Sequence, residues 1–135
     1  MSQKVFVYGT LRRGERAEHL MAGAQWMGFA RTAPGFRLIS MGWYPAMIAI
    51  PQTVGAVAVE GIAPSGVIGE IYDVPEAMIP ALDAYEDVPH LYTRVPVPLS
   101  EGALPSAMAY LLRPEHSAGR PVIPSGDWCR RTPGS

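Results

Sequence analysis

The fold is decided by residues 67–86, VIGEIYDVPEAMIPALDAYE, where the apolar pattern changes from strand-like to helix-like. Residues 67–74 are rich in β-branched and aromatic side chains and predict a strand, one face of which carries Ile68, Glu70, Tyr72 and Val74. Because proline suits the first position of a helix, a helix is predicted over residues 75–86. Pro80 falls after the first turn and should kink this helix or split it in two.

Glu86 is the unusual residue of the predicted helix. At about 100° per residue it falls between Leu82 and Ile79, inside the apolar stripe rather than on its polar border. A carboxylate directed at apolar surroundings is costly unless it is paired or used, and its pKa tends to rise toward neutrality. Glu86 is therefore a candidate for proton transfer, and the alternative is a structural ion pair with Arg94 as the obvious partner. The stripe comprises Pro75, Met78, Ile79, Leu82 and Tyr85.

Most of the remaining chain is predicted to form short strands. They span residues 5–8, 25–32, 36–40, 44–50, 92–99 and 107–113, with a short helix at 17–21. Residues 11–16 are predicted to be an exposed loop, and residues 57–62 either an extra hairpin arm or a loop that packs on itself. Fourteen prolines and 14 glycines imply frequent turns. One helix among many short strands favours a closed or nearly closed sheet with the helix against it.

The composition indicates a single domain over residues 1–135, with a tail from about residue 130 that we expect to be mobile. The net charge of −1 argues against a general binder of nucleic acids or membrane surfaces. No apolar run approaches the ~20 residues of a membrane span, and no signal peptide is recognisable, so the expected location is the cytoplasm. The single cysteine, Cys129, excludes an internal disulfide.

A second candidate site lies directly after the first predicted strand, at Tyr8, Gly9, Thr10 and Leu11. A strand that ends in glycine lets successive backbone N–H groups point into one cavity, where they can bind a carboxylate or an oxyanion. The alternative is a plain tight turn, since short turns with glycine are common.

Tyr92 and Arg94 lie on one face of the predicted strand over residues 92–99. They could orient Glu86 or contact a substrate, and the alternative is a pair that faces solvent on a half-exposed strand. Both are retained as candidate substrate-binding residues.

A thiol nucleophile is a further alternative, with Cys129 assisted by His116 or His90. The spacing matches no local signature, and the cysteine lies in a loop-like tail. The three histidines, which include His19, are too scattered along the chain to suggest a metal site.

Several segments together resemble the γ-glutamylcyclotransferase-like family. They occur in the same order as in that family and cover most of residues 4–113. VFVYGTLRRG (5–14) matches the N-terminal signature of the family, and GWYPAM (42–47) matches its Tyr-Pro segment. GEIYDV (69–74) matches the strand before the helix, and LDAYED (82–87) followed by LYTR (91–94) matches the catalytic segment. SGDW at 125–128 extends the match. The γ-glutamylamine cyclotransferase branch is the most similar.

The resemblance implies an α+β fold, namely a small mixed β-barrel with one or two flanking short helices, without cofactor or metal. It implies that a small-molecule γ-glutamyl amine or peptide is cyclised to 5-oxoproline and the free amine is released. By similarity, Glu86 is the general acid/base, and the turn at residues 8–11 lines the pocket for the γ-glutamyl group. The alternative function is a non-catalytic binding module that keeps this pocket.

The sequence departs from the family pattern in two places. It does not determine which amine is released, nor does it determine the oligomeric state. Residues 52–66 resemble an insertion, which could form a lid or a longer hairpin. Asp87 stands where some relatives have a small residue, and it would reduce tolerance for an acidic leaving group.

Overall fold

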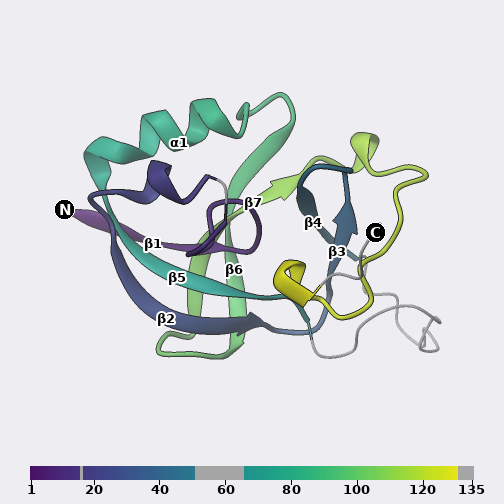
Figure 1. Ribbon diagram of the computed structural model, residues 1–135, viewed down its shortest axis with the longest axis horizontal. Coiled ribbons are helices and arrows are strands. Elements are labelled where there is room, and N and C mark those ends of the chain that lie inside the picture. Colours follow the sequence, from purple (N-terminus) through teal and green to yellow (C-terminus); the bar gives the residue numbers. More distant parts are fainter. Residues whose placement is uncertain (16, 51–65, 131–135) are drawn as a thin grey trace.

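The computed structural model describes residues 1–15, 17–50 and 66–130 (Figure 1). Seven strands, one α-helix and four short 3-10 helices follow one another in this part of the chain. In chain order they are β1 (Ser2–Val7), η1 (Glu18–Met21), β2 (Gln25–Thr32), β3 (Phe36–Ser40), β4 (Pro45–Ala49), β5 (Ile68–Pro75), η2 (Glu76–Met78), α1 (Ile79–Tyr85), β6 (Tyr92–Glu101), β7 (Ser106–Leu112), η3 (Pro114–His116) and η4 (Trp128–Arg130). None of these helices is long and apolar enough to cross a membrane.

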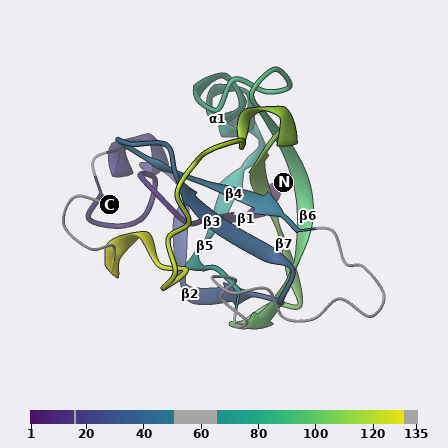
Figure 2. The same cartoon turned by 90° about the vertical axis from the view of Figure 1, so that its right-hand side faces the viewer.

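Five strands close into a barrel in the order β1-β5-β2-β6-β7. β1 pairs with β7 in parallel, whereas the other neighbours in the barrel are antiparallel, so the barrel is mixed. β3 and β4 form a separate two-stranded sheet beside it (Figure 2), and α1 lies across one side of the barrel (Figure 1). The small mixed β-barrel with a flanking helix is therefore confirmed.

The predicted strands over residues 25–32 and 36–40 match β2 and β3 residue for residue. β6 is longer than predicted and runs to Glu101 through Pro96 and Pro98. Proline cannot donate a ladder hydrogen bond, and both prolines precede Leu99 and Glu101, the two positions at which β6 pairs with β2. β6 can therefore contain both prolines and still form its hydrogen bonds with β2.

The predicted helix over residues 75–86 is corrected in its first half. β5 continues to Pro75, which lies opposite Ser2 of β1, and η2 then fills the interval to α1. Pro80 stands in the first turn of α1, where its missing N–H is not needed. Pro80 thus splits the helix, as its position indicated.

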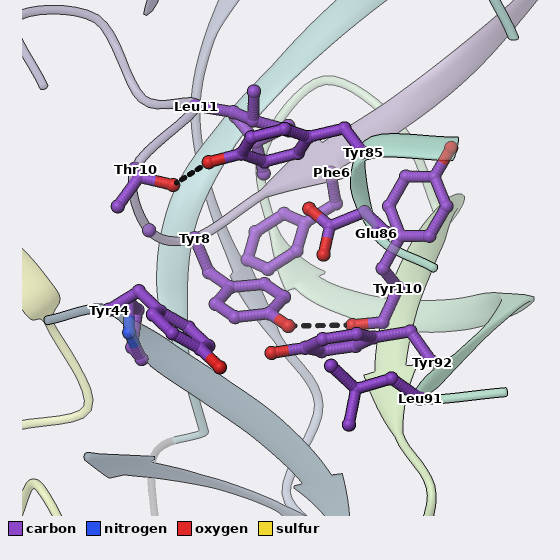
Figure 3. Close-up of a pocket in the computed structure, with 13 residues that line it drawn as sticks. Phe6, Tyr8, Thr10, Leu11, Tyr44, Tyr85, Glu86, Leu91, Tyr92 and Tyr110 are labelled. Atoms are coloured by element: carbon purple, nitrogen blue, oxygen red, sulfur yellow. Dashed lines mark hydrogen bonds between the residues drawn. The ribbon is translucent and has the colours of Figure 1, made fainter. Parts of the chain in front are cut away.

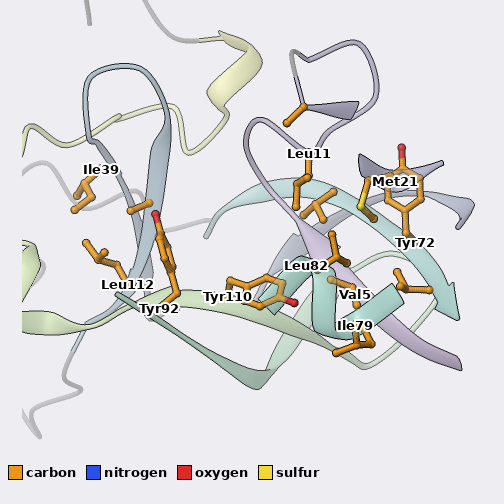
Figure 4. Close-up of a cluster of buried hydrophobic side chains, with 14 residues drawn as sticks. Val5, Leu11, Met21, Ile39, Tyr72, Ile79, Leu82, Tyr92, Tyr110 and Leu112 are labelled. Carbon is orange, nitrogen blue, oxygen red and sulfur yellow. The ribbon is translucent and has the colours of Figure 1, made fainter. Parts of the chain in front are cut away.

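A cluster of buried side chains joins α1 to the barrel (Figure 4). Leu82 and Ile79 of α1 pack in one cluster with Val5 of β1 and Val74 of β5, and each is at most 4% exposed. Because this face of α1 is anchored in the core, the end of the helix, where Glu86 lies, is held in place.

Two predictions fall on residues outside the described ranges. They are the hairpin arm or loop at 57–62, with most of the insertion at 52–66, and the tail beyond residue 130.

Candidate active site

A cavity of about 320 Å³ lies between the end of β1, the start of β4 and the end of α1 (Figure 3). All four residues of the 8–11 turn line it, together with Glu86 and Tyr92. The structure thus brings the 8–11 turn and Glu86 to one cavity, although Leu11 and Glu86 are 75 positions apart in the sequence. Of the predicted site residues, Arg94 does not line this cavity. The other lining residues are Phe6, Val7, Tyr44, Pro45, Tyr85, Leu91 and Tyr110.

The 8–11 turn is closed by its own backbone. The N–H groups of Arg12 and Ala17 donate to the carbonyls of Gly9 and Thr10, at 2.9 Å in each case. Within the described ranges, no hydrogen bond uses the N–H groups of Gly9, Thr10 or Leu11. Thr10 Oγ1 and the hydroxyl of Tyr85 are 3.1 Å apart, which ties the turn to α1. The turn therefore lines the cavity with three backbone donors that have no partner among the described residues.

Gly9 is required because Pro45 packs directly against it. A Cβ added at Gly9 would lie 2.5 Å from Cγ and 2.8 Å from Cδ of Pro45. We expect Gly9→Ala to displace the turn and lower kcat/KM about 10²-fold, since a shift of about 1 Å at a binding site has such an effect. Steady-state kinetics with a γ-glutamyl substrate measures this, and Gly9→Ala combined with Pro45→Ala should regain activity. A double variant no better than Gly9→Ala contradicts the packing explanation.

Glu86 follows the last residue of α1, and its N–H donates to the carbonyl of Leu82 at 3.0 Å. Its carboxylate points toward the tyrosines of the cavity (Figure 3), and no described residue donates a hydrogen bond to it or pairs with it. Burial raises the pKa of Glu86 from 4.5 to about 7. Both protonation states are therefore populated at neutral pH, as a group that accepts and returns a proton requires.

The alternative of a Glu86–Arg94 ion pair is wrong, and the expected contact of Arg94 with the cavity is corrected with it. Arg94 Nε donates to Asp83 Oδ1 at 2.9 Å, and Arg94 Nη1 donates to Gln3 at 3.0 Å. Asp83, one turn before Glu86 in α1, also accepts from the hydroxyl of Tyr110 at 2.8 Å. Asp83 thus takes the arginine, and Arg94 does not line the cavity.

The unusual pKa of Glu86 predicts a pH-dependent cost in stability. Glu86 ionises near 4.5 in the unfolded chain and near 7 in the folded protein, so the folded state binds more protons between these values. The free energy of unfolding of the wild type should therefore fall, relative to Glu86→Gln, as pH rises from 4.5 to about 7, and the difference should stay constant above. At ~1.4 kcal/mol per pH unit, Glu86→Gln should be more stable by up to about 3 kcal/mol at pH 8.

Urea unfolding of both proteins at pH 4.5 and pH 8 measures this difference. Equal differences at the two pH values would contradict a Glu86 pKa that is raised by folding.

Tyrosines form much of the cavity wall around Glu86. The hydroxyl of Tyr8 donates to the carbonyl of Tyr110 at 2.7 Å. Burial, reinforced by the nearby Glu86, raises the pKa values of Tyr8 and Tyr92 well above their ordinary value. These hydroxyls therefore stay protonated at neutral pH, and both side chains line the cavity.

Behind the 8–11 turn lies a buried ionic cluster of Arg12, Glu70 and Asp127. Arg12 Nε and Nη1 donate to Glu70 at 2.6 Å and to Asp127 at 2.7 Å, and Arg12 is only 4% exposed. Burial alone lowers the pKa of Arg12, but the hydrogen bonds to both carboxylates outweigh it and raise the pKa. Glu70 also accepts from Trp26 Nε1 and from the N–H of Arg13, at 3.0 Å in each case.

This cluster corrects the prediction that residues 11–16 form an exposed loop, because Leu11 and Arg12 are buried. The signal was Glu70, which the sequence placed on the same strand face as Ile68, Tyr72 and Val74. A carboxylate among apolar neighbours needs a cation, so Glu70 indicates a basic partner in the interior.

Cys129 does not line the cavity, and its thiol lies 3.8 Å from a carboxylate oxygen of Glu15. Burial raises the pKa of Cys129, which disfavours the reactive thiolate. Within the described ranges, no three His, Cys, Asp or Glu side chains come together to hold a metal ion.

The barrel, its cavity and the unpaired carboxylate define a small β-barrel protein with a site for one small molecule. Residues 5–130 match the model of the family described as gamma-glutamyl cyclotransferase, AIG2-like. The chain belongs to this family.

Three known proteins illustrate the similarity. A Vibrio cholerae protein with a provisional gamma-glutamylcyclotransferase name is 34% identical over 131 residues, which cover 97% of this chain and 99% of the relative. The gamma-glutamylaminecyclotransferase of Mus musculus is 33% identical over 97 residues, 67% of this chain and 58% of the relative. The crystal structure of c4763, a uropathogenic E. coli-specific protein, superposes with a TM-score of 0.73 at 25% identity and covers 95% of this chain and 93% of that one.

Proposed function

We propose that this protein cyclises a γ-glutamyl amine or peptide to 5-oxoproline and releases the free amine. The observation that carries the proposal is the unpaired carboxylate of Glu86, with a pKa of about 7, in a cavity that the 8–11 turn also lines. The family gives the γ-glutamyl class of substrate, and the mouse relative is named for γ-glutamylamines.

In the proposed reaction, Glu86 moves one proton between two amines. Ionised Glu86 takes a proton from the α-amine of the γ-glutamyl group, and the freed amine attacks the γ-carbonyl of the same molecule. The C–N bond to the leaving group then breaks, and Glu86 returns the proton to the departing amine. Because one substrate contains both reacting groups, binding in a folded pose removes much of the entropic cost of attack.

The 8–11 turn supplies donors for the negative charges of this reaction. The substrate carries an α-carboxylate, and attack on the γ-carbonyl produces an oxyanion. Backbone N–H groups of Gly9, Thr10 and Leu11 are the proposed donors, since no described residue accepts from them. Protonated hydroxyls of Tyr8 and Tyr92 add to a wall that stays neutral near Glu86.

The test is release of 5-oxoproline by the purified protein, measured by mass spectrometry. The substrates are γ-glutamyl-alanine, ε-(γ-glutamyl)-lysine and a γ-glutamyl diamine, and α-glutamyl-alanine is the control. The α-linked isomer has the same composition but cannot form the five-membered ring with its scissile amide. Release from at least one γ-linked compound and none from the isomer is expected. Binding of 5-oxoproline in calorimetry without any turnover would favour the non-catalytic binding module.

A further inference from the structure

A second cavity of about 530 Å³ adjoins the first. The two cavities share Tyr44 and Leu91 as lining residues. The rest of the second wall comes from Met41 and from residues 115–116 and 118–120, beyond the end of β7. The two cavities are therefore neighbours across Tyr44 and Leu91.

The segment that forms this outer wall, residues 113–123, is fixed at both ends. At one end the N–H of Arg113 donates to the carbonyl of Leu91 at 2.9 Å. At the other end the N–H of Ser40 donates to the carbonyl of Pro121 at 2.8 Å. The segment that lines the second cavity is thus hydrogen-bonded to Leu91, which also lines the first cavity, and to Ser40.

The charges on the wall of the second cavity do not cancel. Glu115 is paired with Arg113, whose Nε lies 3.2 Å from its carboxylate, and Arg113 does not line this cavity. Arg120 lines it, and no described residue accepts a hydrogen bond from its guanidinium or forms an ion pair with it. His116 is the other basic side chain there. An unpaired guanidinium favours a carboxylate, which it can bind with two parallel hydrogen bonds.

The order of groups along the two cavities indicates which part of the substrate meets Arg120. In Figure 3, Thr10 and Leu11 lie on one side of the Glu86 carboxylate and Leu91 lies on the other, whereas Tyr44 lies beside Tyr8. If the γ-glutamyl group binds to the turn, as the proposed function has it, the scissile bond is at Glu86. The leaving group then points toward the second cavity.

We propose that the second cavity binds the leaving group, and that Arg120 selects amines that carry a carboxylate. This inference depends on the proposed function. It narrows the substrates to γ-glutamyl compounds of amino acids or peptides and disfavours diamines. It also opposes the expectation that Asp87 reduces tolerance for an acidic leaving group, because Asp87 lines neither cavity.

The test compares γ-glutamyl-alanine with γ-glutamyl-alaninamide, which differ in the carboxylate of the leaving group. The wild type should prefer the acid in kcat/KM, and Arg120→Gln should reduce that preference about tenfold, the low end for a charged hydrogen bond, because Arg120 is exposed. Arg120→Glu should shift the preference toward a γ-glutamyl diamine.

Arg31→Gln is the control, because it removes the same charge at a residue that lines neither cavity and whose partner, Glu101, lines neither cavity. Its preference should equal that of the wild type. An unchanged preference in Arg120→Gln, or an equal change in Arg31→Gln, overturns the inference and leaves the proposed function standing. Absence of 5-oxoproline from every substrate with the wild type overturns both.

Discussion

Glu86→Gln is expected to lower kcat by roughly 10²- to 10⁴-fold, the range for loss of a positioned general acid/base. The amide keeps the shape of the side chain but cannot accept a proton from the α-amine. No described residue depends on the carboxylate for a hydrogen bond, so the fold should not change. Stopped assays for 5-oxoproline measure the rate, and calorimetry with 5-oxoproline confirms that the variant still binds.

Asp87→Asn is the control for this change. It makes the same replacement of a carboxylate by an amide at the next position, where the side chain is exposed and outside the cavity. Asp87 has a φ of +53°, and asparagine tolerates this left-handed conformation as well as aspartate does. Near-normal kcat is therefore expected for Asp87→Asn. If Glu86→Gln is as active as the wild type, Glu86 has no part in the mechanism.

The largest effect on stability is expected for Arg12→Met. Removing the guanidinium leaves Glu70 and Asp127 buried without their cation, and breaking a buried ion pair in this way costs about 3–5 kcal/mol. That is a large fraction of the 5–15 kcal/mol typical of a whole domain. Urea unfolding at pH 7 measures the loss.

Arg31→Met is the matched comparison, since Arg31 pairs with Glu101 at 3.4 Å on the surface. A pair of this kind contributes about 0–1 kcal/mol. If Arg12→Met does not fold, the triple variant with Glu70→Gln and Asp127→Asn should recover folded protein, because no unpaired charge remains in the interior. A loss for Arg12→Met no larger than for Arg31→Met contradicts a stabilising role for the cluster.

The sequence predicted the features that depend on interactions between residues close together in the chain. The strands over residues 25–32 and 36–40 lie on either side of the turn at Pro34-Gly35, a signal carried by neighbouring residues, and both were predicted to the residue. Pro80 acts on its own helix, so its effect was also predictable. The position of Glu86 in the cavity followed from the helical period after Pro80, which relates Glu86 to Leu82.

What the sequence could not predict depends on partners far along the chain. Arg12 is buried against Glu70 and Asp127, which lie 58 and 115 positions away, and nothing near Arg12 indicates these contacts. The alternative partner considered for Arg94 was Glu86, whereas the observed partner is Asp83. The two carboxylates lie one helical turn apart, so helical periodicity does not show which of them pairs with Arg94. The second cavity needs Met41, Leu91 and residues 115–120 at once, and no single segment carries its pattern.

The parallel pairing of β1 with β7 has a consequence for the time at which the protein becomes active during its synthesis. β1 leaves the ribosome before its two neighbours in the barrel, β5 and β7. The turn that follows β1 also needs Asp127 for Arg12. The turn at residues 8–11 therefore stays unfolded until Asp127 has been translated. Such non-local closure makes folding late and cooperative, so no shorter nascent chain should bind substrate.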